Sequence, residues 1–372
     1  MKVLVNAGPW LEVPPAGYGG IENVVATLVP ALRERGVGVV LASVGSSTLE
    51  ADELIHAYDE GQFGELQKPY NQVMGITHAH LARVVSELRG RDDIDLVHDH
   101  VEVVGPAVLS ACGGPPVLHT LHWDLCKHPA FYGAFPSSIA VNGVSRSQLA
   151  RAPEALRAAS LGAIHLATPL AGRDVRVPRG EHLVVMGRIC PLKGQHVAAR
   201  ICQKLGLPLV LAGPVSARDS QAELDDVAQN PYQPLHGHPD VRYHLDQVAP
   251  YLDGEVVRWA GAVGGQERDE LYGSARAALF PIQWDEPGGT AVVEALALGV
   301  PPIGLRRGCL PELIDHGRTG FLAGTEEELA EWILRADEID PEECRREARR
   351  RFSPSVMADR YLELYEQVIG RR

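Results

Sequence analysis

Residues 277–305 read AALFPIQWDEPGGTAVVEALALGVPPIGL, and the order of apolar runs in them predicts the class of fold. Ala277–Ile282 is an apolar run of strand length. Thr290–Leu298 carries apolar residues at helical spacing and stops at Gly299, a residue type that commonly ends helices. Pro302–Leu305 is a second short apolar run. A strand, a helix and a strand in this order predict a βαβ unit of a parallel sheet with helices on its faces.

The same alternation runs through the rest of the chain. We predict further strands at Lys2–Ala7, Val37–Ser43, Ile94–Val97, Val117–Thr120, Ser138–Val144, Leu183–Gly187, Leu207–Gly213 and Val256–Trp259. We predict further helices at Ile21–Arg35, Ile76–Leu88, Gly194–Leu205, Gln266–Arg276, Glu326–Ala336 and Ser355–Ile369. Ser216–Leu252 is polar and rich in His and Pro, so no element is predicted within it. The expected fold is α/β, with two Rossmann-like, doubly wound parallel sheets.

A stretch rich in Pro, Gly and Arg, Thr168–Gly180, separates the two series of elements. The chain has 372 residues, and one domain usually takes about 100–200 residues. We therefore expect an N-terminal domain at residues 1–170, a C-terminal domain at 171–355 and a last helix at 356–372, with the domains facing across a cleft. Ligands of such sheets bind beyond the carboxyl ends of the strands.

The composition argues against several classes of protein. The net charge of -13 is unsuited to nucleic acid, which binds basic surfaces. No apolar stretch reaches the roughly 18 residues of a membrane span, and the N-terminus reads as a strand rather than a signal peptide. The six cysteines form no CxxC pair and are expected to be free thiols in the cytoplasm. The basic run Arg345–Arg351 is interpreted as a solvated helix face.

Two loops between a predicted strand and a helix are suited to binding phosphate. Arg188 and Lys193 lie in the loop GRICPLKG, where a departing diphosphate would find positive charge. Gly288, Gly289 and Thr290 lie in the loop EPGGT and would present backbone N–H groups at the start of a helix. The alternative for the first loop is a pair of ordinary surface cations.

A pair of carboxylates flanks the second loop. Glu286 and Glu294 are eight residues apart, slightly over two helical turns, so they point to a similar side. Glu294 stands among apolar residues and needs hydrogen-bond partners. Ribose hydroxyls or a neighbouring arginine would serve equally well.

A glycine-rich loop, Pro14–Gly20 (PPAGYGG), follows the first predicted strand and precedes a helix. Gly19 and Gly20 permit close backbone approach, and the helix start could accept an anion. A structural turn is the alternative. The glycine spacing matches neither a P-loop nor a dinucleotide-binding fingerprint.

Histidines follow two predicted strands, His98 and His100 after one and His119 and His122 after the next. A hydrogen bond to a sugar hydroxyl and a purely structural role remain open for them, and a metal site is the less favoured alternative because no complete ligand set is evident. The sequence Asp93-Ile-Asp95 is formally a DxD, but it leads into a strand and is interpreted as a turn.

The stretch from about Leu183 to Leu322 resembles the retaining glycosyltransferase family 4, whose members have the GT-B fold. The resemblance is carried by GRICPLKG, WAGAVGGQERDELYGSARAALFP, EPGGTAVVEALALGVPPIG and GCLPELIDHGRTGFL. The first half is similar more loosely, through GYGGIE, DLVHDH, PVLHTLHW and VNGVSRS. The EPGG and GAVGG variants are similar to a bacterial subgroup that includes an avilamycin-biosynthesis glycosyltransferase.

The resemblance implies a function and its residues. A sugar would pass, with retention of configuration and without a metal or other cofactor, from a nucleoside diphosphate sugar to a small-molecule or glycan acceptor. The first domain would bind the acceptor and the second the donor, and the last helix would cross back to the first domain. The implied catalytic residues are Arg188, Lys193, Glu286 and His122, and the implied donor-binding residues are Gly19, Gly20, Arg188, Lys193, Glu286, Gly288, Gly289, Thr290 and Glu294.

The chain also departs from the family pattern. Gly288 stands where the family usually has the Phe of EPFG, and the interdomain segment reads IHLATPL in place of an Asn-Gly pair. A nucleotide-sugar epimerase, a phosphorylase-like enzyme and a noncatalytic nucleotide-sugar binding protein are the alternatives. The base, the sugar, the acceptor and the oligomeric state are not determined by the sequence.

Overall fold

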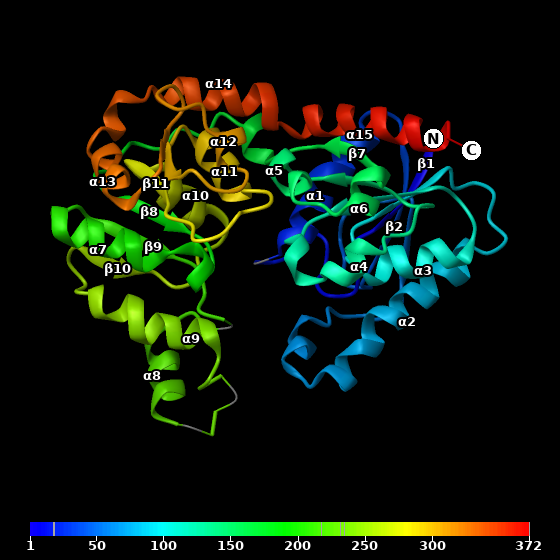
Figure 1. Cartoon of the computed structure of the whole chain (residues 1–372), viewed down its shortest axis with the longest axis horizontal. Coiled ribbons are helices and arrows are strands. Elements are labelled where there is room, and N and C mark those ends of the chain that lie inside the picture. Colours follow the sequence, from blue (N-terminus) through cyan, green and yellow to red (C-terminus); the bar gives the residue numbers. More distant parts are fainter. Residues whose placement is uncertain (18, 217, 231, 234, 372) are drawn as a thin grey trace. The chain divides into compact units, whose positions relative to one another are not determined.

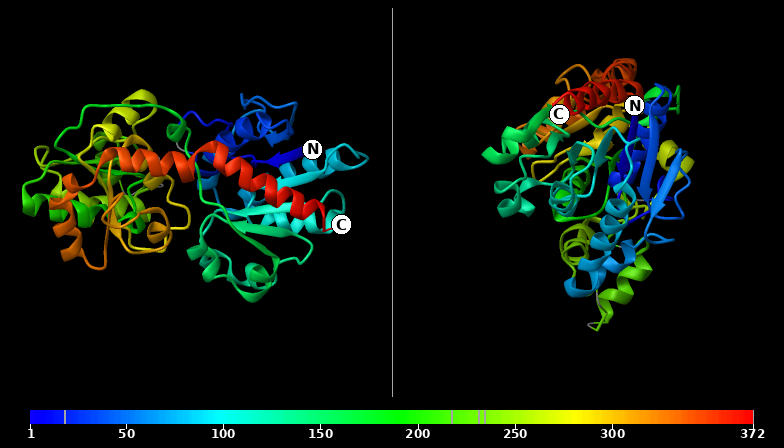
Figure 2. Two further views of the ribbon diagram at one scale, coloured as in Figure 1. Left: turned by 90° about the horizontal axis from the view of Figure 1, so that it is seen from above. Right: turned by 90° about the vertical axis from the view of Figure 1, so that its right-hand side faces the viewer.

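The computed structural model describes residues 1–17, 19–216, 218–230, 232–233 and 235–371. The chain divides into two compact units, one made of Met1–Pro169 and Pro354–Arg372, the other of Leu170–Ser353. Each unit holds one sheet of parallel strands surrounded by helices (Figure 1). Both ends of the chain belong to the first unit (Figure 2).

The sheet of the first unit has the order β3-β2-β1-β4-β5-β6-β7. Its strands are β1 (Lys2–Asn6), β2 (Gly38–Ser43), β3 (Glu53–His56), β4 (Leu96–Asp99), β5 (Val117–Leu121), β6 (Ala140–Gly143) and β7 (Ser160–Ala163). Its helices are α1 (Gly20–Arg33), α2 (Tyr70–Leu88), α3 (Val104–Cys112), α4 (Pro129–Gly133), α5 (Arg146–Ala150), α6 (Glu154–Ala159) and α15 (Pro354–Ile369). The strand order reverses between β1 and β4, the place where such sheets bind ligands.

The sheet of the second unit has the order β10-β9-β8-β11-β12-β13. Its strands are β8 (Leu183–Met186), β9 (Leu209–Ala212), β10 (Val257–Trp259), β11 (Ala277–Phe280), β12 (Pro302–Leu305) and β13 (Phe321–Ala323). Its helices are α7 (Gln195–Leu205), α8 (Gln221–Gln229), α9 (Pro239–Tyr243), α10 (Gly265–Gly273), α11 (Thr290–Leu298), α12 (Leu310–Leu313), α13 (Glu326–Leu334) and α14 (Pro341–Phe352). Here the order reverses between β8 and β11.

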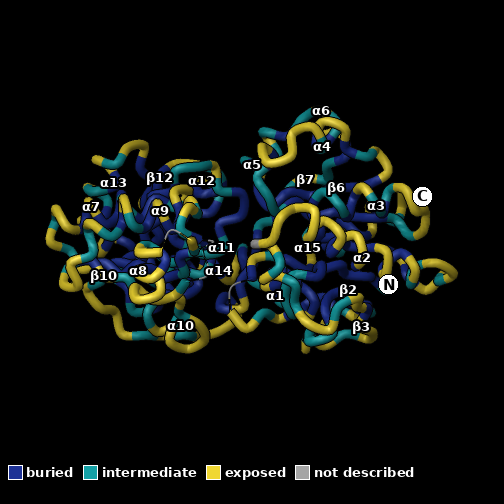
Figure 3. The backbone as a smooth tube through the Cα atoms, turned by 90° about the horizontal axis from the view of Figure 1, so that it is seen from below, coloured by how far each residue is buried: buried dark blue, intermediate teal, exposed yellow. Residues whose placement is uncertain are grey.

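Burial follows from this arrangement. The central strands β5, β9 and β11 are buried along their whole length, as expected for parallel strands with helices on both faces. Buried residues therefore lie at the centre of each unit, and exposed residues lie in the surrounding loops (Figure 3). The prediction of an α/β fold with two parallel sheets is confirmed.

Helix α15 completes the first unit. It packs on α1 and on the strands β4 and β5. The Tyr365 hydroxyl lies 2.8 Å from His98 Nδ1, and the Tyr361 hydroxyl lies 3.1 Å from the Thr120 hydroxyl. These four side chains are buried. The last helix therefore supplies the partner of His98 Nδ1 and adds a contact to the Thr120 hydroxyl, which also bonds Asn142 of β6.

The prediction that Ser216–Leu252 holds no element is wrong. Its described part contains α8 and α9, followed by a π-helical turn at His244–Val248. Ser220 and Glu223 form a capping box at the start of α8, a signal that the sequence displays. The helical pattern is weak because α8 buries few apolar side chains, Leu224 and Val227.

Other differences arise at the edges of the first sheet. The strands β3 and β7 are absent from the prediction because their residues are mostly exposed or half-buried and lack an apolar run. In the middle of the sheet, β4 is shifted by two residues relative to the predicted strand Ile94–Val97, and because it extends to Asp99 it includes His98. None of the helices in the described part of the chain has the length and apolar character to cross a bilayer.

The interpretation of Arg345–Arg351 as a solvated face is wrong at its first residue. Arg345 is buried in α14 and donates to the carbonyl of Leu298, the last residue of α11, at 2.9 Å. A basic side chain satisfies a helix carbonyl that would otherwise lack a partner.

Candidate functional site

The candidate site of the second unit lies at the carboxyl ends of β8 and β11, the two strands between which the sheet order reverses. The loop after β8 carries Arg188 and Lys193, and the loop after β11 carries Glu286. Sequence predicted both loops, and the sheet brings them together because their strands are neighbours.

Lys193 and Glu286 form an ion pair across these loops. Lys193 Nζ lies 2.6 Å from Glu286 Oε2, and Trp284 Nε1 donates to the same oxygen at 3.1 Å. Burial would lower the pKa of Lys193, but the charge and hydrogen bond of Glu286 raise it above its usual value. The ammonium group therefore stays charged at neutral pH, at a position that is about one-third exposed.

The backbone beside this pair is held in a defined shape. Gly289, the residue before α11, has a φ of 66°, a conformation that favours glycine. A side chain there would also meet Cys309 Sγ at 2.8 Å. No side chain caps the N-terminus of α11. The N–H of Val292 donates to the Gly289 carbonyl at 2.9 Å, so an acceptor at this end would contact the N–H groups of the residues before Val292. Thr290 begins this helix, and Gly288 is buried in the loop before it.

Arg188 has a partner that the sequence did not reveal. Its Nη1 lies 2.6 Å from Oδ2 of Asp240, which lies in α9 and is separated from it by 52 residues. The Arg188 side chain is 41% exposed, whereas that of Asp240 is 8% exposed. Asp240 was missed because it lies in the segment for which no element was predicted.

Glu294 also has an ionic partner. It lies in α11 and pairs with Arg268 of α10. Burial raises the pKa of the Glu294 carboxyl, and the charge of Arg268 opposes that rise. Of the two partners expected for Glu294, the structure shows the arginine; Arg268 itself was not singled out by the sequence.

The glycine-rich loop of the first unit leads into α1. Gly19 precedes the helix in an extended conformation, and a side chain there would meet Pro15 Cγ at 2.7 Å. Gly20 is exposed at the first position of α1. Glu22, in the first turn, is buried, and burial raises the pKa of its carboxyl to about 7. Tyr18 of this loop lies outside the described residues.

A cluster of polar side chains occupies the carboxyl ends of β4 and β5. His122 Nε2 lies 2.9 Å from His100 Nδ1, and the backbone N–H of His122 donates to Glu102. His119 lies between two carboxylates, 2.7 Å from Asp99 and 3.5 Å from Glu102. Burial would lower the pKa of His119, but both carboxylates oppose this and raise it to about 9. Burial lowers that of His122 to about 4.

These contacts distinguish His98 and His119 from His122. His98 and His119 are fully buried and satisfied by protein groups, which favours structural roles, whereas His122 is only half-buried. Glu102 holds the backbone of His122 and was not predicted. Among the described residues, no group of three or more His, Cys, Asp or Glu side chains has the arrangement of a metal site. Asp93–Asp95 directly precede β4, as the turn interpretation expects.

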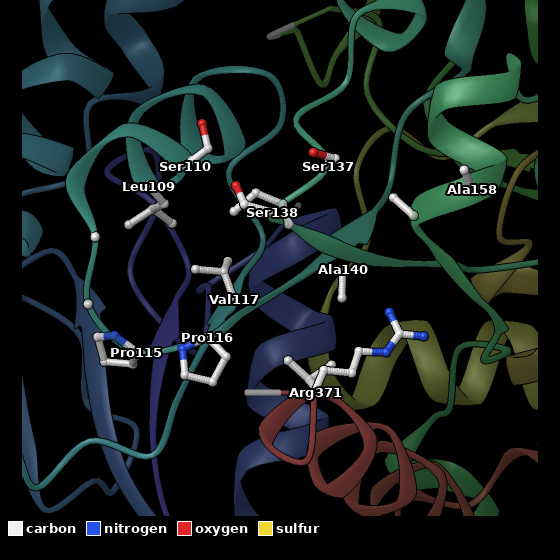
Figure 4. Close-up of a pocket in the computed structure, with 15 residues that line it drawn as sticks. Leu109, Ser110, Pro115, Pro116, Val117, Ser137, Ser138, Ala140, Ala158 and Arg371 are labelled. Carbon is white, nitrogen blue, oxygen red and sulfur yellow. The ribbon is translucent and has the colours of Figure 1, made fainter.

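A cavity of about 420 Å³ in the first unit is a separate feature (Figure 4). Its walls include Val117 and Ala140, the first residues of β5 and β6. It therefore lies at the amino ends of strands whose carboxyl ends carry the histidine cluster, and it is not part of the candidate site.

Family models match both halves of the chain. The model described as glycosyl transferases group 1 matches residues 176–352, and the model described as glycosyltransferase family 4 matches residues 18–154. The chain therefore belongs to the family 4 glycosyltransferases and has their GT-B fold, and the resemblance seen in the sequence is confirmed.

Individual relatives agree with this assignment. A D-inositol 3-phosphate glycosyltransferase of Pseudarthrobacter chlorophenolicus is 27% identical over an alignment of 375 positions. The alignment covers 84% of this chain and 80% of the relative. The structure of AviGT4, a glycosyltransferase involved in avilamycin A biosynthesis, is 26% identical with a TM-score of 0.67, covering 100% of this chain and 98% of that one. Anabaena HepE, solved in complex with UDP and glucose, shares the fold at 18% identity with a TM-score of 0.66, covering 99% of this chain and 100% of that one.

Proposed function

We propose that this glycosyltransferase moves a sugar from a nucleoside diphosphate sugar to a hydroxyl of a small-molecule or glycan acceptor, with retention of configuration and without a metal. The observation that carries the proposal is the Lys193–Glu286 pair beside the uncapped N-terminus of α11. A lysine and free N–H groups suit a diphosphate, and a carboxylate suits sugar hydroxyls. The complex of HepE with UDP and glucose supports this class of donor.

In the proposed reaction the bond between the anomeric carbon and the diphosphate oxygen breaks. The acceptor oxygen bonds to the same face of the sugar, and an oxygen of the leaving diphosphate takes the acceptor proton. Arg188 and Lys193 stabilise the negative charge that grows on the diphosphate, a role that metals fill in other transferases. The charged state of Lys193 suits this role.

The remaining residues are proposed to bind the substrates. Glu294 would exchange part of its contact with Arg268 for the ribose hydroxyls. Glu286, Gly288, Gly289 and Thr290 would contact the donor sugar and phosphates. In the first unit, Gly19 and Gly20 would present backbone to the diphosphate, and His122 would hydrogen-bond the reacting sugar. Involvement of AviGT4 in avilamycin A biosynthesis favours a role in natural-product or oligosaccharide synthesis.

Replacement of the lysine tests the proposal. Lys193→Ala should lower kcat by about 10²–10³, because one preorganised charge at the leaving group is lost. The measurement is acceptor-dependent turnover with UDP-, GDP-, ADP- and TDP-sugars, and a urea titration monitors folding. The exposed Lys204, at the end of α7, provides the matched control as Lys204→Ala, which should turn over like the wild type. Normal turnover of Lys193→Ala would contradict the leaving-group role.

Incubation with donor alone tests the reaction type. A transferase should leave the sugar unaltered until an acceptor is added, apart from slow hydrolysis. Appearance of an epimeric nucleotide sugar would contradict the proposal, as would tight donor binding without turnover on any acceptor.

A further inference from the structure

We propose that Asp240 is a positioning residue that aims the Arg188 guanidinium at the donor diphosphate. The segment between β9 and β10, which carries α8 and α9 and projects from one end of the second unit (Figure 1), is thereby part of the donor site. The proposal rests on the function proposed above, because it takes the diphosphate as the ligand of Arg188.

The ion pair between these residues is asymmetric. Asp240 is nearly enclosed and lies in the first turn of α9, where its N–H donates to His238 Nδ1 at 3.2 Å. Arg188 is partly open to solvent. The aspartate is therefore the fixed member of the pair, and it restrains the arginine rather than the reverse.

The same helix also holds the backbone of the Arg188 loop. The Tyr243 hydroxyl, at the end of α9, accepts from the N–H of His196 at 3.1 Å and lies 3.5 Å from Gln195 Oε1. Gln195 Nε2 in turn donates to the carbonyl of Arg188 at 2.9 Å. Gln195 is fully buried and Tyr243 nearly so, so α9 fixes both the side chain and the main chain of Arg188.

The chemistry of the guanidinium explains how one partner can aim it at another. Arginine has five N–H donors in a rigid plane, and Asp240 contacts one nitrogen, Nη1. In the described part of the chain, Asp240 is the one acidic side chain within ion-pair distance of Arg188. The remaining N–H donors of the guanidinium are left for a phosphate. Because the guanidinium is a rigid plane, the contact with Asp240 sets the direction in which these donors point.

A double-mutant cycle on nucleotide binding tests the inference. Calorimetry would measure the dissociation constants of UDP, ADP, GDP and TDP, and then of the monophosphate of whichever base binds. The proteins compared are the wild type, Asp240→Asn, Arg188→Ala and the double variant. The proposal further assigns Arg188 to the second phosphate of the diphosphate. Asp240→Asn should therefore weaken diphosphate binding about tenfold and monophosphate binding less than about twofold. In the Arg188→Ala background, Asp240→Asn should have no further effect on binding, because the two residues act as one unit.

Two more variants separate positioning from a role in folding. Asp246 lies in the π-helical turn after α9, and its exposed carboxylate pairs with Arg242 of α9. Asp246→Asn removes that carboxylate and should bind nucleotide like the wild type. Asp240→Glu keeps the charge and should lose less diphosphate affinity than Asp240→Asn. It also provides the readout if the asparagine variant does not fold.

Several results would overturn the inference. Wild-type or tighter diphosphate binding by Asp240→Asn would show that the aspartate is idle or competes with the ligand. Equal losses for mono- and diphosphate, or a loss that persists without Arg188, would show a merely structural role. These results leave the proposed function standing. If the wild type binds no nucleoside diphosphate, the proposed donor class fails and the inference fails with it.

Discussion

Glu22 shows how one buried carboxyl group couples the first unit to pH. It lies in the first turn of α1, and burial is the largest cause of its raised pKa, with a smaller contribution from the charge of Glu12. The pKa in the folded protein is about 7, against 4.5 for an exposed glutamate. Between these values the unfolded chain has released the proton and the folded chain has kept it, so stability falls as pH rises from about 4.5 to 7.

Glu22→Gln should therefore change the pH dependence of stability. Glutamine resembles the neutral acid and cannot ionise, so the variant should be more stable than the wild type at pH 8 by up to about 3 kcal/mol and similar at pH 4. Urea unfolding at both pH values measures the difference. Glu34→Gln, at the exposed end of the same helix, is the control and should stay within about 0.5 kcal/mol of the wild type. An equal effect of Glu22→Gln at both pH values would contradict the prediction.

Residue-scale contacts also decide which histidine remains available to a ligand. His119 is enclosed by Asp99 and Glu102. His122 is held through its backbone by Glu102 and through Nε2 by His100, and its side chain is half-buried. The raised pKa of His119, about 9, means that its charge stabilises the fold fully below about pH 6.5 and that this contribution is lost as pH rises through 9.

At the scale of elements, α11 is the helix on which the candidate site depends. Its N-terminus lies beside Glu286, and its C-terminus ends at Gly299 with a φ of 75°. Arg345 donates to Leu298 and Arg179 donates to Gly299, so two basic side chains satisfy the last carbonyls. Positive charge at this end is also favourable for the helix dipole.

Removal of the buried cap should destabilise the second unit. Arg345→Met keeps most of the side-chain length but leaves the Leu298 carbonyl without its charged donor, at a cost of about 1–3 kcal/mol. The adjacent Arg346 is exposed and pairs with Glu343, so Arg346→Met should cost less than about 0.5 kcal/mol. Urea unfolding of both variants compares them directly. Equal stability of the two would show that the cap contributes nothing.

At the scale of the whole molecule, the first unit is completed by the last helix of the chain. α15 brings Tyr361 and Tyr365 to buried polar groups on β4 and β5, the strands that also carry the histidine cluster. The first sheet therefore depends on residues that follow the entire second unit in sequence.

A chain that ends at Ser353 should lose the order of the first unit selectively. Without α15, the side chains of His98 and Thr120 lose their tyrosine partners, and buried apolar surface of α1 becomes exposed. Hydrogen exchange should show loss of amide protection in β4 and β5 and unchanged protection in β8 and β11. A chain ending at Ile369 keeps the helix and should behave like the full chain. Full protection of β4 in the shorter chain would contradict this dependence.

Two parallel sheets, and the positions of the loops that carry Lys193 and Glu286, could be predicted from the order of the residues. The apolar runs, the glycine stops and the spacing of Glu286 and Glu294 are local patterns, and local patterns follow directly from strand and helix geometry. The segment Ser216–Leu252 escaped prediction because its helices bury too little apolar surface to leave such a pattern.

The partners of the charged groups follow from the tertiary structure. Lys193 meets Glu286 across 93 residues, and Arg188 meets Asp240 across 52. Strand order and the path of a polar crossover set these pairings, and neither is written in the periodicity of the residues concerned. An ion pair needs two groups within a few ångströms in space, whereas a sequence pattern reports only which face of its own element a residue occupies.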